Sequence, residues 1–414
     1  MKKHYDVIIV GSRCAGSTLA IELGKANYNV LMLDQATFPS DTNSTHTFFN
    51  NTVHMLKELD VMSELENTSA PAIQRVLFQF DDIKIEGDLP PIYNEERSYC
   101  IPRKFFDQVM LNKATSFTTV THIEGFRVKS LLKESDTVVG VEGTNQAGQI
   151  LQFTAKLVVG ADGRNSTIRD LLKLTPKQKV PTDFAFFYSY ITDLEQSSPP
   201  KFEVYRIHDR TLVIFPTTEG QYVVFIAFPL TYKTWLKTFR EKPQEAYLEF
   251  LKTNFPEIHL ESRLTNATVV ERVKGLIGFN NHWYPAMGKG WALVGDAAVF
   301  KDPGVAQGMH DAIYGGRALA DVLKHHDWEL QLEEMRELYE KKLEEKFSEL
   351  FGLALTLTKN QLISVEQKMI QRIVSANPEA TKQFLGMYNH ANTIDEFNQT
   401  IVKIIQASGG SPKS

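Results

Sequence analysis

A short apolar strand that runs directly into a glycine turn constrains this chain more than any other feature. Residues 6–10 (DVIIV) are mostly apolar and β-branched, as a buried parallel strand requires, and Gly11 follows where the chain has to turn. A helix is predicted over residues 15–25, and a second strand over residues 29–33 ends at Asp34. The first turn of such a helix offers backbone N–H groups to phosphate oxygens. The unit therefore predicts a pyrophosphate site, with Asp34 placed to accept hydrogen bonds from a ribose diol.

The glycine loop departs from the usual G-x-G-x-x-G pattern at one position. Arg13 stands where the middle glycine normally lets the backbone approach the phosphates, so the pattern is G-x-R-x-x-G. An arginine there predicts a different loop path or a guanidinium close to the dinucleotide. The loop residues predicted to bind the dinucleotide are Gly11, Arg13, Cys14, Ala15 and Gly16.

Two further segments in which a strand meets a glycine turn occur later in the chain. Residues 157–169 (LVVGADGRNSTIR) are an apolar strand followed by a turn that contains Asp162. Residues 291–298 (WALVGDAA) bring Gly295 and Asp296 to the end of a third strand. The loop 302–309 (DPGVAQGM) then leads into a helix that is predicted to run through Leu323. Each turn is a weak signal alone, whereas the three in this order are specific.

In this order the segments resemble the fingerprint of the FAD-dependent monooxygenases of the aromatic-hydroxylase type, the para-hydroxybenzoate hydroxylase-like group A flavoproteins. A subset of that family carries the G-x-R-x-x-G variant, and residues 160–169 match its G-A-D-G-x-x-S-x-x-R motif without a mismatch. The resemblance spans residues 4–325. It implies FAD as the cofactor, with Asp162 and Asp296 near the ribityl chain and with Ser166 and Arg169 holding the second turn.

The resemblance implies more FAD contacts elsewhere. Residues 101–110 (IPRKFFDQVM) resemble the family's arginine-led helix, in which Arg103 would lie against the FAD phosphates or the adenosine ribose; a solvated arginine is the alternative. The helix after the loop 302–309 would direct its N-terminus at the flavin, where negative charge collects on reduction. The contacts implied in this part of the chain are Gly295, Asp296, Pro303, Ala306, Gly308 and Met309.

The predicted fold class is α/β, with a Rossmann-like FAD-binding domain, an inserted antiparallel-sheet substrate domain and C-terminal helices. Alternating apolar residues between Phe184 and Phe228 predict the inserted sheet, and helical spacing beyond Asp327 predicts helices over 330–357, 364–375 and 393–407. The domain boundaries follow from these patterns: FAD-binding domain 1–72, 97–178 and 276–328; substrate domain 73–96 and 179–275; helical region 329–407; disordered tail 408–414.

The aromatic residues at alternate positions of the inserted sheet have two interpretations. Aromatic residues on one face of a sheet commonly form core, but the family resemblance places such a face over the flavin ring. On that second interpretation the candidate substrate-pocket residues are Phe186, Tyr188, Phe215 and Pro216, and His46 is the one histidine expected near the flavin.

The composition of the chain limits the kinds of partner that it can bind. A formal net charge of −5 without long basic runs argues against nucleic-acid binding, and no apolar run reaches the roughly 18 residues of a transmembrane helix. Two cysteines predict neither a disulfide framework nor a metal site. We expect a cytoplasmic protein, monomer or homodimer, that binds a small-molecule substrate and O₂.

The resemblance implies a monooxygenase that hydroxylates a small aromatic or polyketide-like substrate through a C4a-hydroperoxyflavin. NADPH or NADH would reduce the FAD and, because no second glycine-rich nucleotide unit follows, would bind transiently; a separate flavin reductase is the alternative. Two other enzyme classes share the scaffold, the flavin-dependent halogenases and the geranylgeranyl-type reductases of prenyl double bonds. A non-catalytic flavoprotein that uses FAD for structure or sensing is the remaining alternative.

Overall fold

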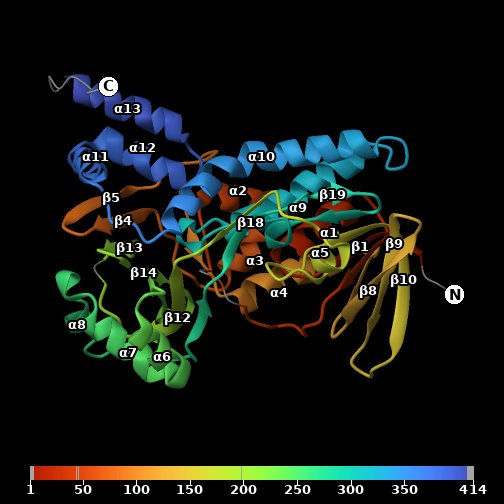
Figure 1. The fold of residues 1–414 in the computed structure, drawn as a ribbon, viewed down its shortest axis with the longest axis horizontal. Helices are drawn as coiled ribbons and strands as arrows, with labels where there is room; N and C mark the ends of the chain where they lie inside the picture. The colour runs from red at the N-terminus through yellow and green to blue at the C-terminus, as the bar shows by residue number, and fades with distance from the viewer. Residues whose placement is uncertain (1–3, 43, 45, 197, 408–414) are drawn as a thin grey trace.

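The fold is an α/β structure built on two large sheets, with helices at the C-terminal end (Figure 1). The computed structural model describes residues 4–42, 44, 46–196 and 198–407. The predicted tail 408–414 lies outside the described residues. In the described part of the chain, no helix is both long and apolar enough to cross a membrane.

The first sheet carries the three segments with glycine turns. Its strands lie in the order β19-β20-β10-β1-β2-β7, and β20, β10, β1, β2 and β7 run parallel. β8 and β9 extend β10 as an antiparallel hairpin, which the sequence analysis did not predict. The strand bounds are β1 His4–Val10, β2 Val30–Leu33, β7 Val120–Ile123, β8 Arg127–Glu134, β9 Thr137–Thr144, β10 Ile150–Gly160, β19 Met287–Gly288 and β20 Trp291–Leu293.

Helices cover this sheet and bury its apolar strands. α1 packs between α4 and α9, and its face is buried from Cys14 to Gly24. The bounds are α1 Cys14–Lys25, α2 Asn50–Glu58, α3 Met62–Glu66, α4 Arg103–Thr115, α5 Thr167–Leu172 and α9 Gly308–His325. The predicted helix over 15–25 and the one ending at Leu323 are therefore present, each within two residues of its expected end.

The second sheet is the predicted insertion. Its order is β16-β12-β15-β14-β13-β4-β5, with β17 also paired to β12. One pair, β13 with β4, is parallel, because the β4–β5 hairpin comes from a distant part of the chain and adds to the edge of the inserted meander. The bounds are β4 Arg75–Phe80, β5 Ile83–Asp88, β12 Phe184–Thr192, β13 Phe202–Ile207, β14 Arg210–Pro216, β15 Tyr222–Pro229, β16 Thr268–Val269 and β17 Lys274–Ile277.

The two faces of the second sheet have different neighbours. Successive residues of β12 point to opposite faces of the sheet, so Phe186 packs in one apolar cluster and Phe187 in another. The Phe187 face is covered by three helices. These helices are α6 Lys233–Glu241, α7 Pro243–Thr253 and α8 Leu260–Arg263. The Phe186 face looks towards the loop that precedes α9 and towards the C-terminal helices.

Four helices form the C-terminal region: α10 Leu332–Leu357, α11 Val365–Ala376, α12 Pro378–Tyr388 and α13 Ile394–Ala407. α10 packs along α9, and the Tyr339 hydroxyl donates to the Leu293 carbonyl oxygen at 3.0 Å. α11 and α12 contact β5, so they close one end of the second sheet. α12 was not predicted.

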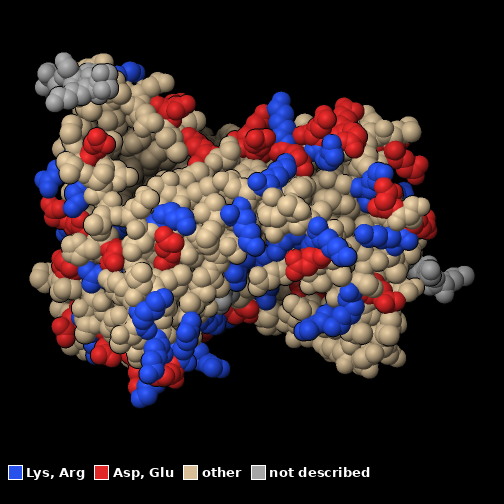
Figure 2. Space-filling view, in the orientation of Figure 1, with Lys and Arg blue, Asp and Glu red and all other residues tan. Residues whose placement is uncertain are grey.

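Short elements connect these units: β3 Thr47–Phe48 pairs with β6 Tyr99–Cys100, and β18 Asn280–Trp283 joins β11 Gln178–Pro181 to β21 Val299–Phe300. On the face drawn in Figure 2, acidic and basic side chains are interspersed, and the outline narrows between the part that holds α6–α8 and the part that holds β8 and β9.

Candidate functional site

The three glycine turns meet at one edge of the first sheet. Val10 pairs with Gly160, and Gly160 pairs with Leu293, so the carboxyl ends of β1, β10 and β20 lie side by side. The Ala161 amide donates to the Val10 carbonyl oxygen at 2.7 Å, and the Val294 amide donates to the Gly160 carbonyl oxygen at 3.0 Å. Ligands of open α/β sheets bind at this edge.

The backbone passes so close to residues 11 and 16 that only glycine fits at either position. Gly11 has a φ of +105°, and a Cβ atom there would lie 2.3 Å from the Ala161 carbonyl oxygen. A Cβ atom on Gly16 would lie 1.8 Å from the Gly11 carbonyl oxygen. The two glycines therefore let the loop fold tightly onto the start of α1, where backbone N–H groups point outward.

Asp34 holds this loop directly. Its Oδ2 atom accepts from the Ser12 amide at 2.7 Å, and its Oδ1 atom accepts from the Ala36 amide at 2.8 Å. Each carboxylate oxygen retains a lone pair for a further donor. Contact of Asp34 with a ribose diol stays a prediction.

Arg13 of the glycine loop and Arg103 of α4 both bind Asp107, also in α4. Arg13 Nη1 donates to Asp107 Oδ2 at 2.8 Å, and Arg103 donates to Oδ1 from Nε at 3.0 Å and Nη2 at 2.8 Å. Arg13 also donates to Ser40. Arg103 is buried, so the alternative of a solvated arginine is wrong. Contact of either guanidinium with FAD stays a prediction.

Cys14 belongs to the same cluster. Its Sγ atom donates to Asp107 Oδ1 at 3.5 Å, and burial raises the pKa of the thiol above its usual range. A neutral thiol packs well at the start of α1 and is a poor nucleophile.

The second turn is held as the motif predicts. Ser166 caps α5 by accepting from the Arg169 amide at 3.0 Å. The Arg169 side chain reaches the third turn, where Nη1 donates to the Ala297 carbonyl oxygen at 3.2 Å. Asp162 accepts from the Ile168 amide through Oδ2, whereas its buried Oδ1 atom has no partner in the described structure. Burial raises the pKa of Asp162.

The third turn carries a carboxyl group with a shifted pKa. Burial raises the pKa of Asp296 to about 6, although the positive charge of Arg103 opposes the shift. Below pH about 6 the protonated form of Asp296 is therefore favoured, and a hydrogen bond from a ligand would favour the charged form.

The loop between this turn and α9 is tightly constrained. Pro303 begins a single 3₁₀ turn, Asp302 Oδ1 accepts from the Gly304 amide at 2.9 Å, and Ala306 has a φ of +53°. α9 then begins at Gly308, and Met309 is buried in its first turn.

These features fit FAD. Backbone donors at the start of α1 suit a pyrophosphate, and the unpartnered Asp162 Oδ1 atom suits a ligand hydroxyl or N–H group. The start of α9 adds donors next to the loop 302–306. The FAD contacts expected from the sequence are thus brought to one edge of the sheet and its flanking loops, while the contact of each residue with FAD stays a prediction.

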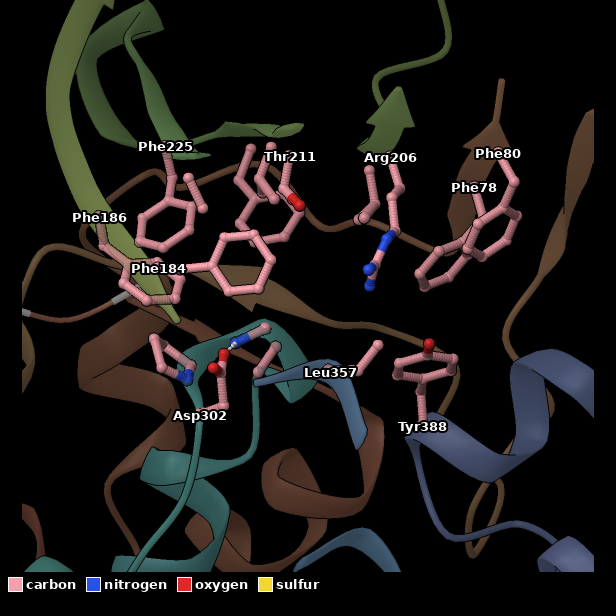
Figure 3. A pocket seen from close by; sticks show the side chains of 17 residues that line it. Phe78, Phe80, Phe184, Phe186, Arg206, Thr211, Phe225, Asp302, Leu357 and Tyr388 are labelled. Atoms are coloured by element: carbon pink, nitrogen blue, oxygen red, sulfur yellow. Dashed lines mark hydrogen bonds between the residues drawn. The ribbon is translucent and has the colours of Figure 1, made fainter. Parts of the chain in front are cut away.

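A cavity lies between the Phe186 face of the second sheet and the loop 302–306 (Figure 3). Its walls are mostly phenylalanine and aliphatic side chains, with Leu357 from the end of α10 and Tyr388 from the end of α12. The polar side chains among its described lining residues are Arg206, Thr211, Asp302 and Tyr388.

The structure separates the predicted pocket residues into two groups. Phe186 and Phe215 line the cavity, whereas Tyr188 and Pro216 are not among its lining residues. Tyr188 lies farther along β12, where its hydroxyl donates to the Thr42 carbonyl oxygen at 3.2 Å. Alternation predicts the face of a residue but not its position along the strand. The pocket role of all four residues stays a prediction.

His46 packs with the tyrosines of β12. Its ring stacks on Tyr190 at 5.6 Å between centroids, and Nε2 is 3.0 Å from the Tyr190 hydroxyl. Burial lowers the pKa of His46 to about 3, so the imidazole is neutral at physiological pH. The residue is a hydrogen-bonded loop histidine, and its role near the flavin stays a prediction.

Sequence reasoning missed Arg206 and Asp302 in the cavity. Arg206 follows the apolar residues Phe202 and Val204 at alternate positions of β13, and that break in the alternation was the available signal. Burial raises the pKa of Asp302 to about 6. Its Oδ2 atom has no partner in the described structure.

A second hollow lies between α2, α9 and α10 and is lined mainly by polar and charged residues. Its arginine and several of its lysines are paired: Arg317 contacts Glu22 and Glu58, Lys324 contacts Glu22, and Lys342 contacts Asp321. It therefore suits the aromatic substrate expected from the sequence less well than the first cavity does.

Residues 4–337 match the family described as FAD binding domain. The chain belongs to that family. As a member, it is an FAD-dependent oxidoreductase with the Rossmann-like fold predicted from the three turns.

Known relatives catalyse different reactions. The chain is 24% identical over 412 residues to the digeranylgeranylglycerophospholipid reductase of Methanosarcina acetivorans, covering 97% of this chain and 95% of the relative. It is 25% identical over 350 residues to the kynurenine 3-monooxygenase of Anopheles gambiae, covering 78% and 68%. Among solved structures, the myxobacterial chondrochloren halogenase CndH superposes with a TM-score of 0.74 at 18% identity, covering 97% and 96%. The last likeness shows the fold alone.

Proposed function

We propose that the protein is an FAD-dependent monooxygenase that hydroxylates a small aromatic or polyketide-like substrate with O₂ and NAD(P)H. The observation that carries this proposal is the aromatic cavity on the loop 302–306, next to the start of α9. Similarity to a kynurenine monooxygenase supports the reaction class.

The cavity would serve the chemistry by excluding water. Phe184, Phe186 and Phe225 form an apolar wall, and Leu357 and Tyr388 close the cavity from the C-terminal helices. FAD, when bound, supplies a redox centre that accepts hydride from a nicotinamide and delivers oxygen from O₂ to an electron-rich carbon. Bulk water in such a site would divert the oxygen to hydrogen peroxide, so a dry wall favours hydroxylation.

The chain's own residues would hold and tune the cofactor. The start of α1 and the tight Gly11 turn would bind the pyrophosphate, and Asp162 and Asp296 would accept hydrogen bonds from the ligand. Backbone N–H groups at the start of α9 would stabilise negative charge on the reduced ring.

The test is to follow the absorbance of the purified FAD-loaded protein mixed with NADH or NADPH without oxygen and then with air. A panel of phenols is included, and O₂ uptake, hydrogen peroxide and product mass are measured. Uptake coupled to a product 16 mass units heavier, a mass gain that corresponds to about one oxygen atom, supports the proposal. A halogenated product in the presence of chloride or bromide contradicts it, as does failure to consume O₂ with every phenol and either nicotinamide.

A second candidate is reduction of an isoprenoid double bond. The similarity to an archaeal reductase extends over almost the whole of both chains, and the cavity is largely apolar. This reaction needs no O₂. Anaerobic saturation of a prenyl substrate by the chemically reduced protein would favour it over hydroxylation.

A further inference from the structure

The hollow between α2, α9 and α10 contains one lysine that has no acidic partner. Arg317, Lys324 and Lys342 each pair with a carboxylate that also lines the hollow. Lys346 of α10 is the remaining Lys or Arg among the described lining residues, and no carboxylate oxygen of those residues lies within 4.0 Å of its Nζ atom. Its side chain is half-buried and lies over the Tyr314 ring, with Nζ 5.7 Å from the ring centroid. Lys346 therefore offers an unpaired positive charge to a ligand in the hollow.

The acidic residue that acts on Lys346 from a longer distance is Asp311 of α9, and the protein already uses it. Asp311 forms an ion pair with Lys301 at 2.7 Å and accepts from His310 Nδ1 at 3.0 Å. All three residues are buried. Burial lowers the pKa of Lys346, and the charge of Asp311 opposes this effect. Asp311 thus compensates Lys301 and leaves the charge of Lys346 without a partner of its own.

Two stacked histidines lie near this lysine. The His310 and His390 rings are 4.8 Å apart between centroids, and Tyr314 continues the stack at 6.2 Å from His310. His390 follows the end of α12, and its buried Nε2 atom has no partner in the described structure. Burial lowers the pKa of His390, and nearby positive charge lowers it further. The ring is therefore neutral at physiological pH, and one of its nitrogens carries a hydrogen that it can donate.

Asn51 supplies a further donor from α2. Its Oδ1 atom accepts from the Thr52 amide at 2.8 Å, whereas its buried Nδ2 atom has no acceptor in the described structure. Asn51 is only 8% exposed, and it lines the hollow. An unpaired buried donor is unfavourable, and an oxygen atom of a bound ligand would satisfy it.

These donors suit a phosphate group. An ammonium group, an imidazole and a side-chain amide come from three separate elements, and a phosphate has enough oxygen atoms to accept from all of them. Lysine binds phosphate as a point charge, whereas a planar carboxylate is matched best by an arginine fork. The arginine of this hollow, Arg317, is occupied by Glu22 and Glu58.

We propose that the hollow between α2, α9 and α10 is a second ligand site, which binds the phosphate group of a phosphorylated small molecule through Lys346, His390 and Asn51. The hollow and the aromatic cavity have no described lining residue in common. The site is thus separate from the one on which the proposed function rests, and it stands or falls independently of that function.

The hollow has room for the rest of such a molecule. Its lining residues on α9 extend from His310 to Lys324, a distance of about 21 Å along the helix axis. At its rim the Tyr93 ring lies 4.3 Å from the His54 ring between centroids and is 78% exposed. An exposed aromatic ring offers a stacking surface for a nucleotide base.

The experiment measures binding by calorimetry on the FAD-loaded protein, without turnover. The probes are pairs that differ by one phosphate group: AMP and adenosine, NADP⁺ and NAD⁺, glycerol 3-phosphate and glycerol. We expect at least one phosphorylated probe to bind about tenfold more tightly than its partner, a difference of about 1.4 kcal/mol, and inorganic phosphate to compete with it. A preference in the glycerol pair means that the phosphate group suffices, whereas a preference confined to the other two pairs identifies the ligand as a nucleotide.

Variants assign that preference to the hollow. Lys346→Met and His390→Phe, which keeps a ring for stacking on His310, are each expected to weaken the phosphorylated probe about tenfold and to leave its partner within about twofold. Asn51→Asp keeps the oxygen used by Thr52 but repels phosphate, and it should weaken that probe at least as much. Lys341→Met changes a 70% exposed side chain on α10 and should leave both affinities unchanged. FAD content and melting temperature establish that each variant is folded.

The outcomes decide the proposal directly. Equal binding within every pair overturns it, as does failure of every phosphorylated probe to bind below about 10 mM. A phosphate preference that survives both Lys346→Met and His390→Phe places the phosphate elsewhere on the protein and also overturns it. An equal loss of affinity in Lys341→Met shows a general effect of net charge and likewise contradicts a site in the hollow.

Discussion

Arg13 in the first glycine loop and Asp107 in α4 are joined by a hydrogen bond of 2.8 Å between opposite charges, although 94 residues separate them. Asp107 also binds Arg103 and Cys14, and its side chain is fully buried. The side chain at the unusual position of the glycine motif thus fastens the loop to α4.

The first prediction concerns this carboxylate. Asp107→Asn leaves two arginines beside a neutral amide, and breaking a buried ion pair typically costs about 3–5 kcal/mol. We expect the free energy of urea unfolding to fall by about that amount at pH 7. Asp170→Asn, whose side chain is 77% exposed, serves as the control and should change stability little. A loss in Asp107→Asn no larger than in the control would contradict the role of Asp107.

The second prediction concerns the close approach of the first and second turns. Gly11→Ala places a Cβ atom 2.3 Å from the Ala161 carbonyl oxygen at a positive φ, so the loop has to move. We expect the variant to lose most of its FAD during desalting, as measured by the ratio of flavin to protein absorbance. Gly352→Ala, in an exposed part of α10 with nothing within 4 Å of the added atom, should retain the wild-type ratio. Full retention in Gly11→Ala would refute the assignment of this turn.

The third prediction concerns pH and Asp302. The carboxyl has a usual pKa of 3.8 and a folded pKa of about 6. The folded chain holds this proton more tightly than the unfolded chain, so the contribution to stability is present below pH about 4 and lost as pH rises through 6. The loss is about 2–3 kcal/mol. In Asp302→Asn, which keeps an oxygen for the Gly304 amide, this dependence should disappear.

Urea unfolding of the FAD-free protein between pH 4 and pH 8, a range of about four units that spans both pKa values, measures the effect. The exposed Asp193→Asn makes the same charge change and should keep the wild-type profile. Parallel profiles for wild type and Asp302→Asn would show that the carboxyl does not titrate as expected.

The fourth prediction concerns His46, whose pH effect has the opposite sign. Its pKa falls from 6.5 to about 3 on folding, so the unfolded chain takes up a proton that the folded chain does not. The resulting stability is lost as pH falls from 6.5 towards 3. Tyr190→Phe removes the partner of Nε2 and should cost about 1–3 kcal/mol at pH 7, measured by urea unfolding. Tyr93→Phe, at a side chain that is 78% exposed, should be neutral. A cost for Tyr190→Phe equal to that control would contradict the importance of the hydrogen bond.

Local patterns were sufficient for much of the FAD-binding part. A buried parallel strand is apolar throughout, and a turn such as Gly11 needs a residue without a side chain; both properties are written in neighbouring residues. The family resemblance implied that Ser166 holds the second turn, and Ser166 caps α5 there. The β8–β9 hairpin and α12 were missed, because neither has an equally strong local signal.

The cavity depends on contacts that no local pattern contains. Alternation placed Phe186 and Tyr188 on one face, but only the packing of β12 against distant loops set Phe186 in the cavity and Tyr188 against His46. In the sequence, Arg206 lies near the end of its strand, where a charged side chain is usually exposed. It lines the cavity because β4 adds to β13 and because α12 closes the end of the sheet.

The sequence by itself determined the strands, the glycine turns and the expectation of FAD, because these follow from steric and hydrogen-bonding requirements of adjacent residues. The tertiary structure alone decided which charges enter the cavity. Arg206, Asp302 and Tyr388 come from separate elements, and the free energy of burying each depends on neighbours that are brought together only by folding.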